Sequence, residues 1–363
     1  MCKDTTNKTN IQEKSLFSLP ERVSNKKVNI DFAAPDISSN GGLFLLGSLT
    51  KSIPAKIGSL ICDNRKKEYV QHTYPEMVCQ RVAQILCGYE DANDCDRLRG
   101  DSAIKMAVGR KPSDKALSSQ PSMTRLENSV SNRELYKISE LFVKNYMDSF
   151  AKPPRKIKLD ADDTNANTYG AQQLTLFNTY YNEYCYMPLL IFDGMSGKLI
   201  LPMLRPGRRN KSISISSILI RLINILHERW PNTIIELRGD SHFCSHEFMD
   251  WAHDKWNVRF LTGLSANPVL LKIDKQLRRA KKDYIKAEKN HEERNGVLEK
   301  GENLIQKRIV IRRYYKFDYK AKTWKHEQRV IVKIEVSNEG TNIRFAVTKN
   351  RNNFPNNIQK ILW

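Results

Sequence analysis

The sequence predicts an α/β fold in which a helical N-terminal region precedes a mixed sheet with its own helices, followed by a strongly basic segment. Three observations predict this organisation. Apolar residues recur at helical spacing up to about residue 150 and at every second position beyond Pro154. Asp162 and Asp240 each stand where a predicted strand gives way to a loop, 78 residues apart. Residues 272–329 carry 19 Lys and Arg against 9 Asp and Glu.

Length, composition and charge restrict the class of protein. A chain of 363 residues that is 40% hydrophobic suits two or three domains of an ordinary globular protein. Its net charge of +20 indicates a polyanionic partner, because basic surfaces bind phosphate backbones by releasing counterions. The N-terminus has no signal-peptide core, and the apolar stretch 213–226 is too short and polar to span a bilayer. We therefore expect a cytoplasmic protein without a membrane partner.

The N-terminal part is predicted to be a tail followed by helices. Residues 1–28 are rich in Lys, Asn and Ser and predict a loosely ordered polar tail. Residues 29–150 predict a helical region, which the KPPRK run at 152–156 ends. Its first clear helix is expected to begin at Pro75 and to end at Gly88. The apolar stripe expected on that helix consists of Val78, Val82, Ile85 and Leu86.

Two further helices are predicted in the same region. A short one is expected from Ser122, and a longer one from about Asn132. Apolar residues at i, i+3 and i+4 spacing predict the buried face of the longer helix. These residues are Leu135, Ile138, Leu141, Phe142 and Tyr146.

Residues 155–268 predict the catalytic core. Strands are expected at 157–162, 184–192, 198–204, 233–239 and 258–263, with helices at 212–229 and after a capping Ser245. The turn DGMSG joins the second and third strands into a hairpin. The resulting order, three strands, helix, strand, helix, strand, is that of a ribonuclease H-like core. Acidic residues of such a core stand at the ends of the first and fourth strands.

Residues 269–340 predict a basic insertion domain after the fifth core strand, and residues 341–363 predict a return to the core. A basic helix is expected at about 269–295, before strand-like runs at 305–317, 328–336 and 343–348. A solvated charged face is the simple interpretation of such a segment. The charge excess, however, is one-signed and interleaved with aromatic residues, which favours a nucleic-acid surface. These are Tyr284, Tyr314, Tyr315, Tyr319 and Trp324.

The runs LDADDT and LRGDSHF supply the candidate metal ligands. Alternation along the strand places Asp160 and Asp162 on one face and Asp163 on the other. Like charges this close are costly unless a cation neutralises them, and Mg²⁺ prefers carboxylate oxygens. Asp240 follows a buried strand, where α/β sheets present ligating groups. An acidic turn before Asn165 and a helix-capping role for Asp240 are the structural alternatives.

Several longer runs resemble a known family. The chain resembles the DDE transposases of bacterial insertion sequences, specifically the thirteen-eighty group, which is related to the group-four transposases. The resemblance covers roughly residues 29–350. It rests on GGLFLLGSL, GYEDANDCDRLRGD, LSSQPSMTRLEN, LDADDTNANTYGAQQL, YCYMPLLIFDGMSGKLILPMLRPG, LRGDSHFC and RFAVTKN.

The resemblance implies DNA transposition by metal-dependent cleavage and strand transfer at terminal inverted repeats. Asp162, two residues before Thr164, would be the first catalytic acid, with Asp160 and Asp163 as substitutes, and Asp240 would be the second. These carboxylates would bind two Mg²⁺ ions, which Mn²⁺ could replace. The partners would be inverted-repeat DNA, target DNA and a second copy of the chain in a synaptic complex. No G-x-x-x-x-G-K-[ST] motif occurs, so no nucleotide cofactor is expected.

Eight basic or polar residues are the predicted DNA contacts. SMTRLEN is the candidate recognition helix, although polar residues on a packing helix would explain it almost as well. The other candidates lie in RPGRRNK and in the basic segment. The full set is Arg125, Asn128, Arg208, Arg209, Lys281, Lys282, Arg312 and Arg313.

The third acid of the family is missing from its expected pattern. The family places a glutamate in Y-x-x-R-x-x-x-E, but no tyrosine after Asp240 has an arginine three residues later. Glu327 and Glu335 are the nearest substitutes and lie in strand-like sequence. We therefore expect a C-terminally truncated transposase with impaired strand transfer, so its status as an enzyme stays open. The alternative is a non-catalytic DNA-binding protein that occupies inverted repeats and competes with intact transposase.

Overall fold

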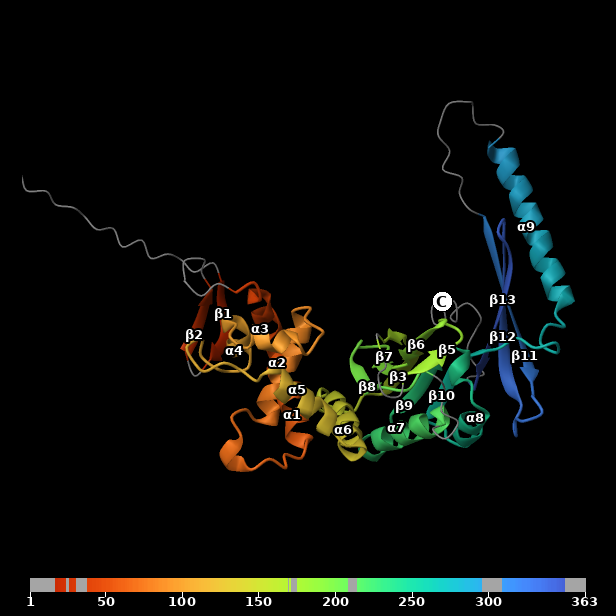
Figure 1. Cartoon of the computed structure of the whole chain (residues 1–363). Helices are drawn as coiled ribbons and strands as arrows, with labels where there is room; N and C mark the ends of the chain where they lie inside the picture. Colours follow the sequence, from red (N-terminus) through yellow and green to blue (C-terminus); the bar gives the residue numbers. More distant parts are fainter. Residues whose placement is uncertain are drawn as a thin grey trace, which may run out of the picture. The chain divides into compact units, whose positions relative to one another are not determined.

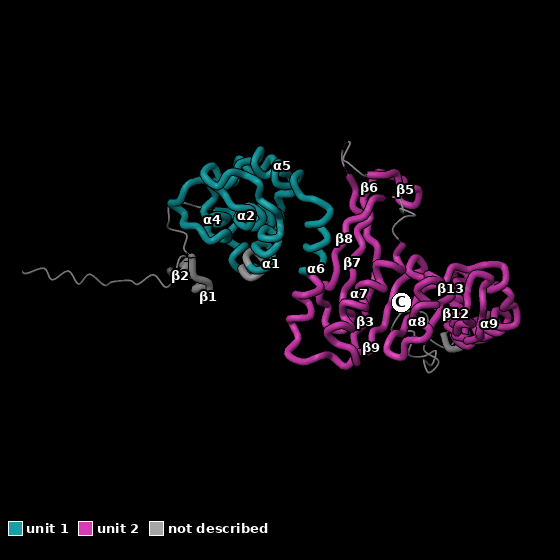
Figure 2. Tube along the Cα trace, turned by 90° about the horizontal axis from the view of Figure 1, so that it is seen from below, with its two compact units in different colours: residues 1–141 teal, residues 142–363 magenta. Residues whose placement is uncertain are grey.

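The computed structural model describes residues 17–23, 26–30, 38–168, 170, 175–207, 214–295 and 309–349. The chain divides into two compact units, residues 1–141 and 142–363 (Figure 2). The first unit is mainly helical, and the second contains a large mixed sheet (Figure 1). The fold is therefore mixed α/β. Among the described residues, no helix has the length and apolar character needed to cross a bilayer.

The first unit begins with two strands that the sequence did not predict. β1 (Phe17–Val23) and β2 (Lys26–Ile30) pair antiparallel, where only a polar tail was expected up to residue 28. Short helical segments follow, and α6 crosses the boundary into the second unit. They are η1 (Gly41–Leu46), α1 (Gly47–Leu60), η2 (Lys67–Tyr69), α2 (Tyr74–Leu86), α3 (Asp94–Leu98), α4 (Ser102–Ala107), α5 (Gln120–Ser129) and α6 (Asn132–Asp148).

Helix α2 forms where predicted, but its buried face is not the predicted apolar stripe. Ile85 and Leu86 are exposed, whereas Gln80 and Gln84 are fully buried. Gln80 donates to the Ser118 carbonyl oxygen at 2.9 Å and accepts from the Ser118 N–H at 3.0 Å, and Gln84 accepts from the Cys95 thiol. Burial of Gln80 is tolerated because both ends of its amide are hydrogen-bonded, whereas the Gln84 Nε2 has no partner among the described residues. The helix therefore turns a mixed face inward, in which the two glutamines lie among apolar residues such as Met77 and Ala83.

Helix α6 is exposed at its predicted Leu135 and buried toward its C-terminal end. Its N-terminal turn is held by Glu134, whose carboxylate accepts from the Cys62 N–H at 2.6 Å and from the Ser131 N–H at 2.7 Å. The predicted Leu135 is 52% exposed, whereas Tyr146 is buried. The C-terminal half of the helix therefore packs into the core of the second unit, with Val143 and Met147 beside Tyr146.

An eight-stranded sheet forms the centre of the second unit, in the order β11-β12-β13-β10-β9-β3-β7-β8. Strand β3 pairs in parallel with β9 and antiparallel with β7. Strand β10 pairs in parallel with β9 and antiparallel with β13. The bounds are β3 (Lys156–Asp163), β7 (Leu189–Asp193), β8 (Leu199–Met203), β9 (Ile234–Gly239), β10 (Val258–Leu264), β11 (Val310–Tyr319), β12 (Gln328–Ser337) and β13 (Gly340–Thr348).

One face of the core strands is apolar and covered by helices. The register aligns Ile157 with Ile235 and Leu159 with Leu237, and these side chains are at most 1% exposed. Helix α7 (Ile215–Arg229), helix α8 (His246–His253) and the end of α6 pack into this core (Figure 1). The predicted Ser245 cap is confirmed, because its hydroxyl accepts from the Phe248 N–H. The opposite face of the same strands carries the charged residues.

The strand predicted at 184–192 is in fact two strands in two sheets. β6 (Glu183–Tyr186) belongs to a small sheet with β4 (Ala166–Asn167) and β5 (Leu176–Asn178), in the order β4-β6-β5. The break before β7 coincides with Pro188, which has no backbone N–H to donate to a ladder. The predicted hairpin with the DGMSG turn is formed by β7 and β8 alone.

The basic segment extends the core sheet. Strands β11, β12 and β13 form a long antiparallel ribbon that joins the core through β10 and β13. Helix α9 (Asp274–Asn295) lies along this ribbon (Figure 1), with the buried Ile273 and Ala280 in the shared core. This part of the chain is thus continuous with the sheet that bears Asp162 and Asp240.

Candidate active site

Asp162 and Asp240 lie side by side on one face of the sheet. The register of the parallel strands β3 and β9 ends with the pair Asp160–Arg238. Asp162 and Asp240 each follow two positions later, Asp240 as the first residue beyond β9. Neighbouring strands are about 4.8 Å apart, and both residues follow the same alternation as the pair before them. Both residues therefore stand at the carboxyl ends of two parallel strands, and both line the same two clefts.

The two other candidate ligands are bound by arginines. The Asp160 carboxylate accepts from both Nε and Nη2 of Arg238, and the Asp163 carboxylate is ion-paired with Arg205. Among the described residues, neither Asp162 nor Asp240 forms an ion pair with a lysine or an arginine. The structure thus separates the four acids into two carboxylates neutralised by arginines and two, Asp162 and Asp240, that no described lysine or arginine neutralises.

Electrostatics at the pair favour a cation. Desolvation by surrounding atoms raises the pKa of Asp162 above its ordinary value of 3.8; a backbone hydrogen bond from Asp163 lowers this pKa, and the negative charge of Asp240 raises it. Asp240 caps the short helix η3 (Ser241–Phe243), where its Oδ1 accepts from the His242 N–H at 2.8 Å. The His242 ring lies 3.6 Å from Asp240 Oδ2 and 3.5 Å from Asp163 Oδ2. Asp240 is thus both the predicted ligand and the capping residue of the alternative interpretation.

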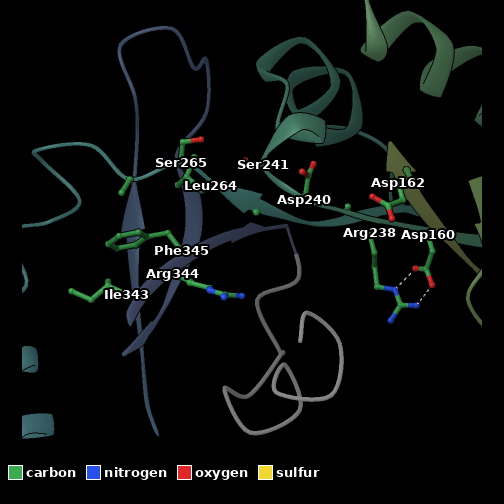
Figure 3. A pocket seen from close by; sticks show the side chains of 14 residues that line it. Asp160, Asp162, Arg238, Asp240, Ser241, Leu264, Ser265, Ile343, Arg344 and Phe345 are labelled. Atoms are coloured by element: carbon green, nitrogen blue, oxygen red, sulfur yellow. Dashed lines mark hydrogen bonds and ion pairs between the residues drawn. The ribbon is translucent and has the colours of Figure 1, made fainter. Parts of the chain in front are cut away.

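Two clefts open on either side of the pair. The first, of about 540 Å³, is lined by Asp162, Asp240 and Arg238 and by residues of β10 and β13. The side chain of Arg344 extends into this cleft from β13, and the Asp160–Arg238 ion pair lies at its far side (Figure 3). The second, of about 870 Å³, shares Asp162 and Asp240 and is also lined by Asp163, by His242 and by residues of β5 and the turn that follows it. A phosphate at the two acids would have room on both sides.

The residues present fit a hard divalent cation. Mg²⁺ keeps several waters and uses one or two protein carboxylates together with substrate phosphates. Asp162 and Asp240 supply two such carboxylates on rigid strand ends. Within the described ranges, no three His, Cys, Asp or Glu side chains converge on a metal position. The substitutes Glu327 and Glu335 line neither cleft, and Glu335 is ion-paired with Arg312 and Lys333.

The predicted DNA contacts are distributed over both units. Arg125 and Asn128 lie on the exposed side of α5 in the first unit. In the second unit, Lys281 and Lys282 lie on the exposed side of α9. Arg312 and Arg313 lie on β11, where they form ion pairs with Glu335 and Asp283. Arg208 and Arg209 are outside the described residues.

Sequence reasoning missed several residues of the site. Arg238 and Arg205 hold the two other aspartates, and Phe177, Tyr180 and Tyr181 line the larger cleft. One signal could have identified Arg238. The pairs Asp160–Arg238 and Asp162–Asp240 are both separated by 78 residues, so any register that aligns one pair aligns the other.

Comparison with known proteins gives a family match. The family described as transposase DDE domain group 1 matches residues 20–362. No curated protein matches the chain. Two solved structures are similar to it at low identity. A cryo-EM structure of the piggyBac transposase synaptic complex with hairpin DNA has a TM-score of 0.37 and 11% identity, and the match covers 86% of this chain and 61% of that chain. The Mos1 strand transfer complex has a TM-score of 0.19 and 14% identity, with 63% and 78% covered.

Proposed function

The chain belongs to the transposase DDE domain family, group 1, and we propose that it acts in DNA transposition through a metal site formed by Asp162 and Asp240. The observation that carries this proposal is that the two aspartates follow the paired ends of β3 and β9 and line the same two clefts. The proposed reaction is cleavage and strand transfer at terminal inverted repeats. We further propose that the chain is a member of the thirteen-eighty group of insertion-sequence transposases.

We propose that residues 155–268 form a ribonuclease H-like core. Its support is the strand order β8-β7-β3-β9-β10, in which β3 is central and only β7 runs antiparallel to it as a direct neighbour. The order of elements along the chain agrees with this arrangement, since β3, β7 and β8 precede α7, β9, α8 and β10. In this core the first and fourth strands are β3 and β9. They bear the two proposed ligands.

Each residue near the pair has a separate role in the proposed mechanism. When bound, divalent cations would supply Lewis-acid stabilisation of the attacking and leaving oxygens of phosphoryl transfer. Asp162 and Asp240 would hold them, and the His242 N–H orients the Asp240 carboxylate. Because Arg238 is bound by Asp160, it is kept from neutralising the neighbouring pair. Arg344 lines the same cleft, where a cationic group would attract the scissile phosphate.

Strand transfer would need all three acids that the family resemblance implies, and two of them are assigned here, Asp162 and Asp240, since no tyrosine after Asp240 begins a Y-x-x-R-x-x-x-E pattern in these residues. Losing one ligand of a two-metal site removes charge compensation and positioning together. Binding of a cation by Asp162 and Asp240 requires fewer ligands than strand transfer does, so cation binding is tested first.

The test is Mn²⁺ binding measured by electron paramagnetic resonance on purified protein. Asp162→Asn and Asp240→Asn should each weaken binding at least tenfold, since each removes one of two charged ligands. Asp254→Asn, an exposed aspartate at the end of α8, is the matched control and should bind as the parent does. Equal Mn²⁺ binding by the parent and the two site variants would refute the proposed site. Cleavage of supercoiled DNA carrying the element's ends then tests the reaction itself.

A second function, DNA binding without cleavage, is favoured by the exposed face of α9. This face presents one stripe of cations at i, i+3 or i+4, and i+7 spacing, formed by Lys275, Arg278, Arg279, Lys282, Lys286 and Lys289. Such a stripe can follow a phosphate backbone. A chain acting in this way would occupy inverted repeats and compete with intact transposase. Its signature is a gel shift that prefers inverted-repeat DNA over random DNA and weakens steeply with salt.

A further inference from the structure

The small sheet beside the two aspartates exposes an unusual number of aromatic rings. Tyr180 is 87% exposed, Tyr184 60% and Phe177 42%, although such rings are usually buried or paired with a partner. Phe177 and Tyr184 face each other across β5 and β6, with ring centroids 5.5 Å apart in an edge-to-face arrangement. Tyr180 contacts Tyr181 in the same manner at 4.9 Å. Two ring pairs, Phe177–Tyr184 and Tyr180–Tyr181, are thus presented by β5, β6 and the turn that joins them, and three of the four rings are exposed.

The turn that presents Tyr180 is held in place. The Asn178 side chain accepts from the backbone N–H of Tyr180 at 2.9 Å and of Tyr181 at 3.3 Å, and it donates to the Gly207 carbonyl oxygen at 2.8 Å. Asn182 completes the turn with φ of 56°, a conformation that asparagine tolerates better than most residues. A ring presented in this way loses little conformational freedom when it binds a partner.

Three of these rings and the proposed metal ligands share one cleft. Phe177, Tyr180 and Tyr181 line the same space of about 870 Å³ as Asp162 and Asp240. Divalent cations held by the two acids would bind a phosphate of DNA, so the base of an adjacent nucleotide would lie close to that position. Aromatic faces bind bases of any sequence by stacking, and their contribution is largest where the base is unpaired.

We propose that Phe177 and Tyr180, the exposed aromatic residues that line this cleft, stack an unpaired base next to a phosphate bound through the cations that Asp162 and Asp240 would hold. The ligand is thus single-stranded or locally unpaired DNA, whereas intact duplex would not reach the rings. This inference rests on the proposed function, because the phosphate position is taken from the two aspartates. It adds a site that would position the DNA strand where that strand passes from the two aspartates toward the small sheet.

The test compares two DNA probes on the full chain. One is a single strand on the order of 12 nucleotides with one 2-aminopurine, and the other is the matching duplex. Affinity is measured by fluorescence anisotropy with Ca²⁺, and stacking by quenching of the 2-aminopurine. Tyr180→Ala should weaken single-strand binding about 5- to 150-fold and reduce quenching, while duplex binding stays unchanged. Tyr180→Trp should retain both signals, because it keeps an aromatic face.

Trp256→Ala is the matched control, since Trp256 is 67% exposed in the same unit but lines neither cleft. Its binding should equal that of the parent, and thermal melting should show all variants folded. Parent-like single-strand affinity in both Tyr180→Ala and Phe177→Ala would overturn the stacking proposal. If the parent binds Mn²⁺ normally in that case, the proposed metal site stands. Conversely, loss of probe affinity in Tyr180→Ala with no Mn²⁺ binding by the parent would reject the metal site and retain the stacking surface.

Discussion

Replacing Asp162 by asparagine should stabilise the metal-free protein, which is the opposite of what loss of a structural carboxylate does. Two unit charges about 5 Å apart repel by about 3 kcal/mol at an effective dielectric constant of about 20. Because the Asp240 side chain is 55% exposed, solvent screening reduces this to about 1 kcal/mol. For a unit of the size of residues 142–363, a gain of that size raises Tm by about 2–4 °C.

The assay is thermal melting in a chelator, with Asp160→Asn as the matched variant. Asp160 lies two residues away on the same face, but its carboxylate is bound by Arg238, whose side chain is only 15% exposed. Its removal should therefore lower Tm, by about 2–4 °C for a loss of about 1 kcal/mol. The two neighbouring Asp→Asn changes thus have opposite expected signs. A lower Tm for Asp162→Asn in chelator would refute the assignment of the repelling pair.

Metal and pH should change the effect of Asp162→Asn in defined directions. Saturating Mg²⁺ should raise the Tm of the parent more than that of the variant, because ligand binding stabilises only the folded state that holds the ligand. The pKa of Asp162 is raised above its ordinary value, so the folded protein takes up this proton at a higher pH than the unfolded chain does. The advantage of the variant should therefore be complete at neutral pH and should shrink as the pH falls through that raised pKa. An advantage that does not depend on pH would contradict the electrostatic cause.

Three further predictions concern single residues. Gly58→Ala should destabilise the first unit by about 1–3 kcal/mol in urea unfolding, because the added β carbon would overlap the backbone of α2. An unchanged unfolding midpoint would contradict the close contact between the two helices. Gly263→Ala should weaken Mn²⁺ binding, because the added β carbon would lie 3.0 Å from the backbone carbonyl carbon of Asp240 and displace that residue. Binding equal to that of the parent would contradict this displacement. Hydrogen bonds, first that from the Ser131 hydroxyl, lower the pKa of Glu134 from 4.5 to about 2. Its stabilisation should therefore be present above pH 4.5 and be lost as the pH falls toward 2, and Glu134→Gln should flatten this acid dependence in circular dichroism.

Local patterns predicted much of the second unit. Alternation of apolar residues identified the strands that became β3, β9 and β10, and helical spacing identified α7 and α8. The pattern failed where a strand was interrupted. Residues 184–192 read as one strand, but Pro188 separates β6 from β7, which belong to different sheets. Periodicity describes which way side chains alternate, and it carries no information about which strand a segment pairs with.

Helix α2 illustrates a different limit. Its position was predicted from Pro75 and Gly88, whereas its orientation was not. The helix buries Gln80 and Gln84 because Ser118 and Cys95 supply partners from other segments. A hydrophobicity pattern predicts that a glutamine side chain is exposed, because the pattern does not include the hydrogen bond that Gln80 forms with Ser118, 38 positions away.

By itself, the sequence determined the family and the order of the core elements from β7 to β10. The tertiary structure decided which acids are neutralised by arginines and which are not, and it placed Tyr180 beside Asp162 and Asp240. The physical reason is that carboxylate charge depends on neighbours within a few ångströms. Those neighbours come from strands 78 residues apart, and only the parallel register of β3 and β9 brings them together.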